Sequence, residues 1–129
     1  MAEHWLSQGD LTRAREFVDR LHASATEHEV HKYIAVAHQL MAKLALANGD
    51  TSEAVKQFDA ALVELENYPA PLVTWKVHAG RAKLKSQLGD TSAAQESSAR
   101  ATEIVNFIAA NVNDANLRET FLNATRAVL

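Results

Sequence analysis

The residues that decide the fold are two copies of one turn: residues 42–54 read AKLALANGDTSEA, and residues 82–94 read AKLKSQLGDTSAA. Eight of the thirteen aligned positions are identical, and the two copies are 40 residues apart. A shorter copy lies another 40 residues upstream, at Gly9-Asp10. Self-similarity at a fixed period of this length is the signature of a repeat protein, in which each repeat is one supersecondary unit. The sequence therefore predicts two full repeats, preceded by the second half of an earlier one.

Each repeat is predicted to be a pair of helices joined at its Gly-Asp turn. Glycine adopts the left-handed conformation that ends a helix, so Gly49 fits the position just after the first helix. Asp50 can cap the second helix, with Glu53 completing a capping box. Apolar residues at helical spacing predict helices near residues 27–48 and 51–66. The expected core positions are Val30, Tyr33, Ile34, Ala37, Leu40, Met41, Leu44 and Ala45 in the first helix, and Ala54, Val55, Phe58, Ala61, Leu62 and Leu65 in the second.

The prolines predict where the second pair begins. Pro69 and Pro71 form the clearest break in the chain, and proline is tolerated in the first turn of a helix. A third long helix is expected from about residue 70 to 88, and a fourth over 91–111.

Two shorter helices are expected near the ends of the sequence. Asn113 or Asp114 can cap a last helix, which carries Leu117, Phe121, Leu122 and Val128. Upstream, residues 11–23 form the second helix of the incomplete first pair, and residues 3–8 the stub of its first helix. No segment shows sustained alternation of apolar and polar residues, so no sheet is predicted.

The composition is that of one soluble globular domain. The 129 residues are 47% hydrophobic and 22% charged, which argues against disorder. The absence of cysteine excludes disulfides, cysteine-based zinc sites and a thiol nucleophile. A formal net charge of −3 provides no attraction to nucleic acid or to an anionic membrane. With no signal peptide and no apolar run of about 18 residues, we expect a cytoplasmic protein without a membrane span.

A helix pair of this size cannot bury its apolar face alone, so stacked pairs are expected. The repeat resembles the tetratricopeptide repeat (TPR) on the residues Ala42, Ala54, Phe58 and Ala61. The next copy keeps Ala82, Ala94 and Ala101 but has Ser98 where an aromatic residue is usual. The resemblance implies an all-α fold, a right-handed α-α superhelix of about six helices in antiparallel pairs with a C-terminal capping helix. The single domain is divided into a partial repeat (1–25), two repeats (26–68 and 69–111) and the cap (112–129).

A second, narrower resemblance covers roughly residues 30–129. It is to the C-terminal TPR regions of large bacterial signalling proteins, which place such repeats behind a STAND-type ATPase, a nucleotide cyclase, a protein kinase or a DNA-binding domain. The residues that carry it include Pro71, Trp75, Lys76, His78, Ala79, Leu88, Gly89, Asp90, Ile104, Val105, Ile108, Ala109, Asp114, Leu117, Arg118, Phe121 and Leu122. It implies a scaffold role and not an activity.

The sequence offers little for catalysis. No GxxxxGK[ST] phosphate loop occurs, and no Ser/His/Asp grouping can be argued, so no enzyme and no cofactor are predicted. Residues 27–31 read EHEVH, which places His28 and His31 at helical spacing, but a third metal ligand cannot be identified and a solvated helix start is favoured. His38 and His78 occupy equivalent repeat positions, where a structural role between the helices is favoured over contact with a ligand.

Binding is the preferred function. In TPR-like proteins the first helix of each pair lines the concave surface, which here implies a partner-binding groove formed by Gln39, Lys43, Leu72, Trp75, Lys76, Ala79 and Lys83. The lysines would make this groove locally positive. Trp75 could anchor a partner, but packing between successive helix pairs is the favoured alternative.

These observations leave three readings of the function. The first is a non-catalytic protein–protein interaction scaffold, within or related to a bacterial signalling regulator. The second is a sensor that binds a short peptide in the groove, and the third, disfavoured, is an enzyme or metal protein. A protein or peptide partner is expected, with no nucleic acid and no membrane. A homodimer through the N-terminal half repeat is a further prediction, because the helix over residues 11–23 would otherwise expose apolar surface.

Overall fold

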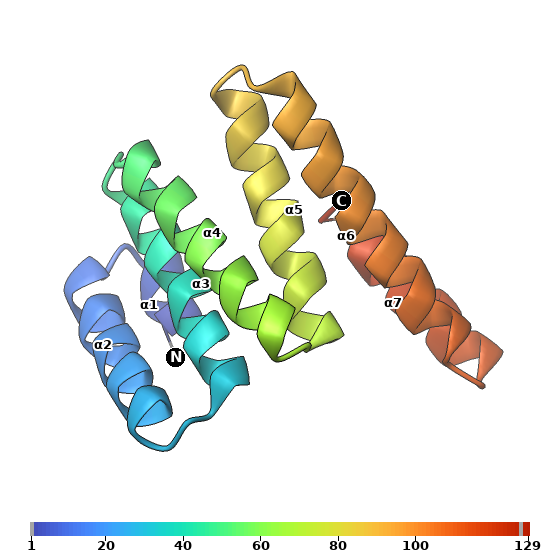
Figure 1. Ribbon diagram of the computed structural model, residues 1–129, viewed down its shortest axis with the longest axis horizontal. Helices are drawn as coiled ribbons and strands as arrows, with labels where there is room; N and C mark the ends of the chain where they lie inside the picture. The colour runs from blue at the N-terminus through green and yellow to red at the C-terminus, as the bar shows by residue number, and fades with distance from the viewer. Residues whose placement is uncertain (1, 127) are drawn as a thin grey trace. The chain divides into compact units, whose positions relative to one another are not determined.

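The computed structural model describes residues 2–126 and 128–129, and every regular element within them is an α-helix (Figure 1). The seven helices of this described part are α1 (Ala2–Ser7), α2 (Leu11–Glu27), α3 (His31–Ala47), α4 (Thr51–Asn67), α5 (Pro71–Gln87), α6 (Thr91–Ala110) and α7 (Ala115–Arg126). Within each of two compact parts of the chain, helices that follow one another pack antiparallel, which is consistent with a helical-hairpin array. The all-α prediction is confirmed. Within the described residues, no helix combines the length and the hydrophobicity needed to cross a membrane.

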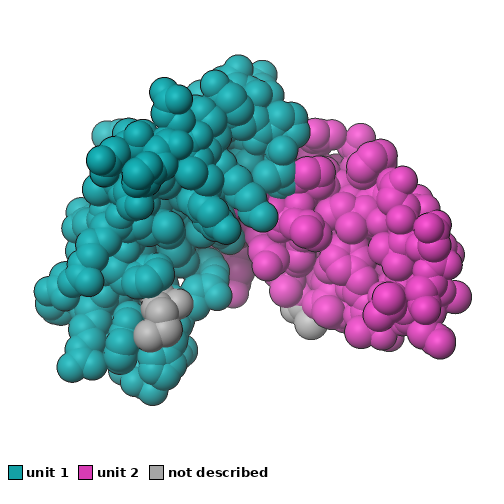
Figure 2. Space-filling view, turned by 90° about the horizontal axis from the view of Figure 1, so that it is seen from below, with its two compact units in different colours: residues 1–70 teal, residues 71–129 magenta. Residues whose placement is uncertain are grey.

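The chain divides into two compact units (Figure 2), residues 1–70 (unit 1) and residues 71–129 (unit 2). In unit 1, α3 packs against both α2 and α4, and the short α1 packs against α2 and α3. In unit 2, α6 packs against α5 and against α7. Each unit has a hydrophobic cluster of its own.

The Gly-Asp turns end one helix and cap the next, as predicted. Gly49 has a positive φ of 77°, and its N–H donates to the carbonyl of Leu46. The N–H of Asp50 donates to the carbonyl of Ala45 at 2.8 Å, which completes the pair of hydrogen bonds of a glycine-ended helix. The Asp50 carboxylate then accepts from the N–H of Glu53 at 3.1 Å, so one residue both closes α3 and caps α4. The turns at Gly9 and Gly89 repeat this arrangement.

The predicted capping box at Asp50 does not form. In such a box the side chain of Glu53 would accept a hydrogen bond from the N–H of Asp50. That N–H is already bonded to the carbonyl of Ala45, and the Glu53 carboxylate instead accepts from Gln57 Nε2 at 2.8 Å. The turn that ends the preceding helix therefore uses the donor that the capping box needs.

The connection between α2 and α3 lies where the sequence predicted the start of a helix. Glu27 is the last residue of α2, and α3 begins only at His31, so the expected helix start near residue 27 is wrong. Glu29 has a φ of 55° and takes the place that glycine holds in the other turns. The N–H of Val30 donates to the carbonyl of Ala25 at 2.9 Å, as in a glycine-ended helix. This turn therefore has the backbone hydrogen bonds of the Gly-Asp turns, although it contains no glycine.

Two hydrophobic clusters contain part of the predicted core, and Ala37, Ala45, Ala54, Phe58, Ala61 and Leu65 are buried outside them. The cluster of unit 1 joins Ala14, Val18, Leu40 and Leu44, with Trp5, Leu6, Leu11, Phe17, Leu21, Val36 and Met41 packed around it. The cluster of unit 2 joins Trp75, Ala79, Ala101 and Val105, with Ile104, Ile108, Phe121 and Leu122 around it.

Some expected core residues are exposed. Tyr33 is 49% exposed, Leu117 is 63% exposed and Val128 is 59% exposed. Tyr33 and Leu117 both lie in the first turn of their helices, at the edge of the packed region. Periodicity identifies the inward face of a helix but not how far along it the partner extends.

Helix α1 bears on the predicted homodimer. That prediction assumed an α2 face without a cover, but Trp5 and Leu6 of α1 pack against the cluster to which α2 contributes. No large apolar side chain of the described α1 and α2 residues is among the strongly exposed ones. The homodimer stays a prediction, with less exposed surface to support it.

Candidate functional site

The two predicted groove residues of unit 1 are both engaged within the unit. Gln39 is buried in α3, with only 8% of its surface exposed. Lys43 is half-buried, and its Nζ lies 2.6 Å from Oε1 of Glu3 on α1. This ion pair neutralises the positive charge that the sequence placed in a groove.

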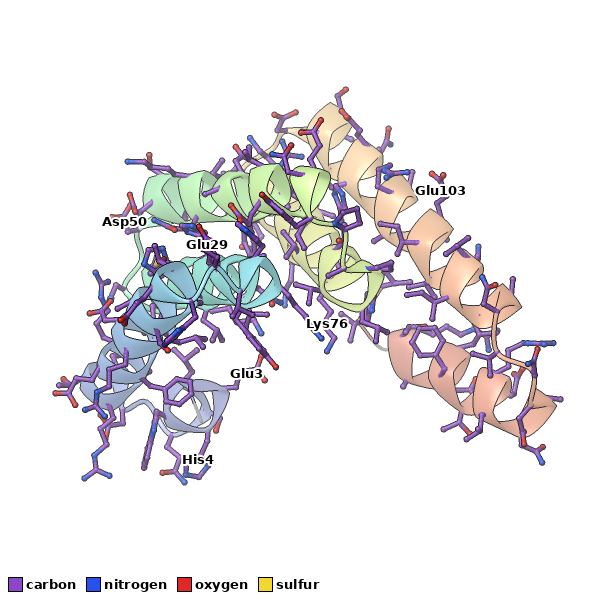
Figure 3. The ribbon with its side chains drawn as sticks, turned by 60° about the horizontal axis from the view of Figure 1, so that its bottom comes forward. Glu3, His4, Glu29, Asp50, Lys76 and Glu103 are labelled. Carbon is purple, nitrogen blue, oxygen red and sulfur yellow. The ribbon has the colours of Figure 1, made fainter. Side chains whose placement is uncertain are left out.

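The predicted groove residues of unit 2 divide into exposed and buried ones. Leu72, Lys76 and Lys83 are exposed, and Figure 3 shows Lys76 projecting outward from α5. Its Nζ lies 5.9 Å from the centroid of the neighbouring Trp75 ring, within the range of a cation–π contact. Trp75 and Ala79 are buried members of the unit 2 cluster.

Trp75 occupies the position expected of a packing residue. Only 4% of its surface is exposed, and its ring packs with Ala101 and Val105 of α6. Its indole N–H is buried, with no hydrogen-bond partner among the described residues. A packing role accounts for this burial, but the contact is with α6 of its own helix pair, where the sequence favoured packing between successive pairs.

A pocket of about 480 Å³ lies in unit 2, between α5 and α6. It is lined by Ala79, Ala82, Lys83, Ser86, Thr91, Ala94, Gln95, Ser98, Val128 and Leu129. Lys83 is the only charged side chain among these lining residues. The small side chains of both helices leave the space open, and Val128 and Leu129 add exposed aliphatic surface at its edge.

The sequence pattern does not predict the contribution of α6 to this pocket, because the TPR resemblance implies binding by the first helix of each pair. A second, shallower hollow continues along α6 and is lined by Gln95, Ser98, Ala99, Thr102, Glu103 and Asn106. The signal that could have found this surface is Ser98, which stands in the repeat position of the buried Phe58.

The repeat-equivalent histidines have different surroundings. His38 Nδ1 lies 2.7 Å from Gln57 Oε1, and its ring meets that of His22 edge-on, with centroids 5.2 Å apart. The Nδ1 of His78 is buried, with no hydrogen-bond partner among the described residues. Burial lowers the pKa of His78 below its ordinary 6.5, and the charges of Arg100 and Arg81 lower it further, while Glu96 opposes them. His38 therefore has a bonded structural position, and His78 is held towards its neutral form.

The histidines of the segment 27–31 do not lie together on one helix. His31 Nδ1 contacts Glu64 Oε1 of α4, and its ring stacks on Tyr68 with centroids 3.4 Å apart. His28 lies in the turn before α3 and is exposed, so the helical spacing assumed for the pair does not exist. No group of three or more His, Asp or Glu side chains in the described ranges could hold a metal ion.

Comparison with known proteins adds no family to this picture. No protein-family model matches the chain, and neither a curated protein nor a solved structure does. The pocket and hollow of unit 2 are therefore interpreted from their own residues.

Proposed function

We propose that this chain is a non-catalytic module that binds another protein through the surface of its helical hairpins. The observation that carries the proposal is the α5–α6 pocket of unit 2, where small side chains leave room for a guest. Exposed aliphatic residues at its edge offer apolar contact area, and hydroxyl and amide side chains offer hydrogen bonds. Both kinds of group are what protein interfaces combine.

A finer form of the proposal places the hairpins in a TPR-like solenoid that serves a bacterial signalling regulator as a scaffold. Its support is the repeated Gly-Asp turn, with the same left-handed glycine and aspartate cap at each copy. The regulatory context rests on the resemblance of residues 30–129 alone. The reading frame around the gene tests this context, because a scaffold of this kind is encoded with or beside an ATPase, a cyclase or a kinase.

The second candidate is a sensor for a short peptide. The observation in its favour is the size of the pocket, since about 480 Å³ accommodates a few residues and falls within the range of small-ligand sites. A scaffold and a sensor differ in what carries the affinity. In a sensor a short peptide binds as tightly as the protein from which it comes, whereas a scaffold needs the larger surface.

The test is chemical cross-linking of the purified chain in cell extract, identification of the cross-linked proteins, and titration calorimetry with each purified candidate. We expect at least one candidate to bind at a defined stoichiometry. A peptide that retains the affinity of its parent protein would favour the sensor. If no purified candidate binds, and the chain instead turns over a substrate or copurifies with a metal, the proposal fails.

A further inference from the structure

The outward side of α6 carries a continuous line of uncharged polar residues. Thr91, Gln95, Ser98, Thr102 and Asn106 are spaced four, three, four and four residues apart, which places them on one side of a helix. All five are exposed. We name this line the α6 polar stripe. It begins in the α5–α6 pocket and continues through the hollow along α6.

The same positions of the preceding repeat have a different character. Forty residues upstream, α4 has Val55, Phe58 and Leu62 where α6 has Gln95, Ser98 and Thr102. Phe58 is buried, and the other two are half-buried. The repeat thus loses three apolar side chains on this face of α6 and gains three that donate and accept hydrogen bonds. A helix face that is only in contact with solvent can carry charged residues. Amide and hydroxyl side chains can also form hydrogen bonds with the backbone of a bound peptide.

The length of the α6 polar stripe indicates how long a peptide could lie along it. From Thr91 to Asn106 a helix rises about 22 Å, at about 1.5 Å per residue. An extended peptide advances about 3.3 Å per residue, so about seven residues would follow the stripe from end to end.

The charge of the pocket indicates the charge of the peptide segment that it would bind. Lys83 lies at the pocket with its side chain exposed, and no carboxylate among the described residues pairs with it. The repeat-equivalent Lys43 is paired with Glu3 at 2.6 Å. The pocket of unit 2 therefore presents a lysine that no described carboxylate pairs with, beside an apolar floor of Ala79, Ala82 and Ala94 and the aliphatic side chains of Val128 and Leu129.

From these features we propose that unit 2 binds an extended acidic segment of a partner protein along the α6 polar stripe. A carboxylate of the segment pairs with Lys83, an aliphatic side chain beside it fills the pocket, and the following backbone bonds to the stripe. This assignment deepens the proposed protein-binding function and rests on it.

The experiment uses the full chain and fluorescein-labelled heptapeptide pools. In one pool every peptide contains one Glu and one Leu, and the pool covers every spacing between them. A matched pool has Lys in place of Glu. Fluorescence anisotropy is expected to show binding of the Glu pool and at least tenfold weaker binding of the Lys pool. Lys83→Glu should weaken binding of the Glu pool about tenfold and favour the Lys pool, since it reverses the charge that selects the guest.

Two further variants separate this site from general damage to the fold. Ser98→Phe restores the α4 residue, fills the pocket and should abolish binding while the thermal melting of the chain is unchanged. Lys56→Glu is the matched control, because this exposed lysine lies in unit 1, and it should leave binding unchanged.

Several outcomes would overturn the assignment. Equal binding of the two pools, or full binding by Lys83→Glu, refutes it. So does sedimentation showing a self-associated chain that Ser98→Phe converts to monomer, since the face would then belong to a second copy. If purified protein partners bind and neither Lys83→Glu nor Ser98→Phe changes their binding, the assignment fails and the proposed function stands. If no partner and no peptide pool binds, both fail.

Discussion

The hairpins α3–α4 and α5–α6 are two versions of one design. Their first helices have the same length, 17 residues, and each hairpin closes with a left-handed glycine followed by an aspartate cap. Their second helices differ where Phe58 in α4 is replaced by Ser98 in α6. The comparison teaches that the turn residues specify the hairpin, while a few residues of the second helix decide whether its outer face is apolar core or polar surface.

The interiors of the two hairpins differ in a related way. In α3–α4, His38 bonds to Gln57, which in turn donates to Glu53. The equivalents of Gln57 and Glu53 in the next repeat are Ser97 and Ala93, which cannot build the same chain of hydrogen bonds. Ser97 instead accepts from Arg81 at 2.6 Å. Arg81, which stands where the earlier repeat has Met41, thus bonds to Ser97, and the Nδ1 of His78 has no hydrogen-bond partner among the described residues.

The largest expected effect comes from truncating to alanine the side chains that distinguish the two second helices. Phe58→Ala removes a side chain that is 2% exposed and should cost about 3–5 kcal/mol of unfolding free energy. Ser98→Ala alters an exposed position of the same repeat and should change it by less than about 0.5 kcal/mol. Urea unfolding measures both, with circular dichroism as the signal.

The two tryptophans make this test specific to each unit. Trp5 packs in the cluster of unit 1 and Trp75 in that of unit 2. In a Trp5→Phe background the remaining tryptophan fluorescence follows unit 2, and in a Trp75→Phe background it follows unit 1. Equal losses from Phe58→Ala and Ser98→Ala would show that the two faces are equivalent and would end the comparison.

Much of the fold could be predicted from the sequence because turn chemistry is local. Gly49 and Asp50 mark a helix boundary to the residue, whatever surrounds them. Glu29 makes the same kind of turn without glycine, so its position depends on contacts that the sequence pattern does not display. The site was harder to predict for the same reason, because the pairing of Lys43 with Glu3 depends on residues far apart in the sequence. The packing role favoured for Trp75, and Ser98 at an aromatic position, were the visible signals.

An intermediate effect is expected from the turns, where glycine and glutamate hold the same conformation. Gly89→Ala should cost about 1–2 kcal/mol, because a side chain at positive φ strains the backbone. An added Cβ there meets nothing within 4 Å, so this strain is the whole expected penalty. Glu29→Gly relieves the same strain and should stabilise unit 1 by up to about 1 kcal/mol.

Thermal and urea unfolding of Gly89→Ala and Glu29→Gly test whether the first variant is less stable and the second more stable than the original chain. Gly49→Ala is the control, since its φ of 77° and open surroundings match those of Gly89. A loss of stability in Glu29→Gly would mean that the glutamate side chain contributes more than its backbone strain costs.

The smallest effect is expected from pH, through His78. Its pKa is lowered in the folded state, mainly by burial, so the unfolded chain binds the proton more readily near pH 6.5. The free energy of unfolding should therefore fall as the pH drops through about 6.5 and continue to fall until the folded pKa is reached. The effect is small because the side chain is only half-buried.

The difference between the chain and its His78→Gln variant isolates this contribution from that of every other titrating group. Unfolding followed by Trp75 in the Trp5→Phe background, at pH 7.5 and pH 5.5, should show a larger loss for the histidine form. Arg100→Gln should reduce the loss without removing it, because burial remains the main cause of the shift when one neighbouring cation is gone. If His78→Gln keeps the whole pH dependence of unit 2, the unbonded histidine does not distinguish α5–α6 from α3–α4 in stability, and the contrast between the two hairpins reduces to the outer face of their second helices.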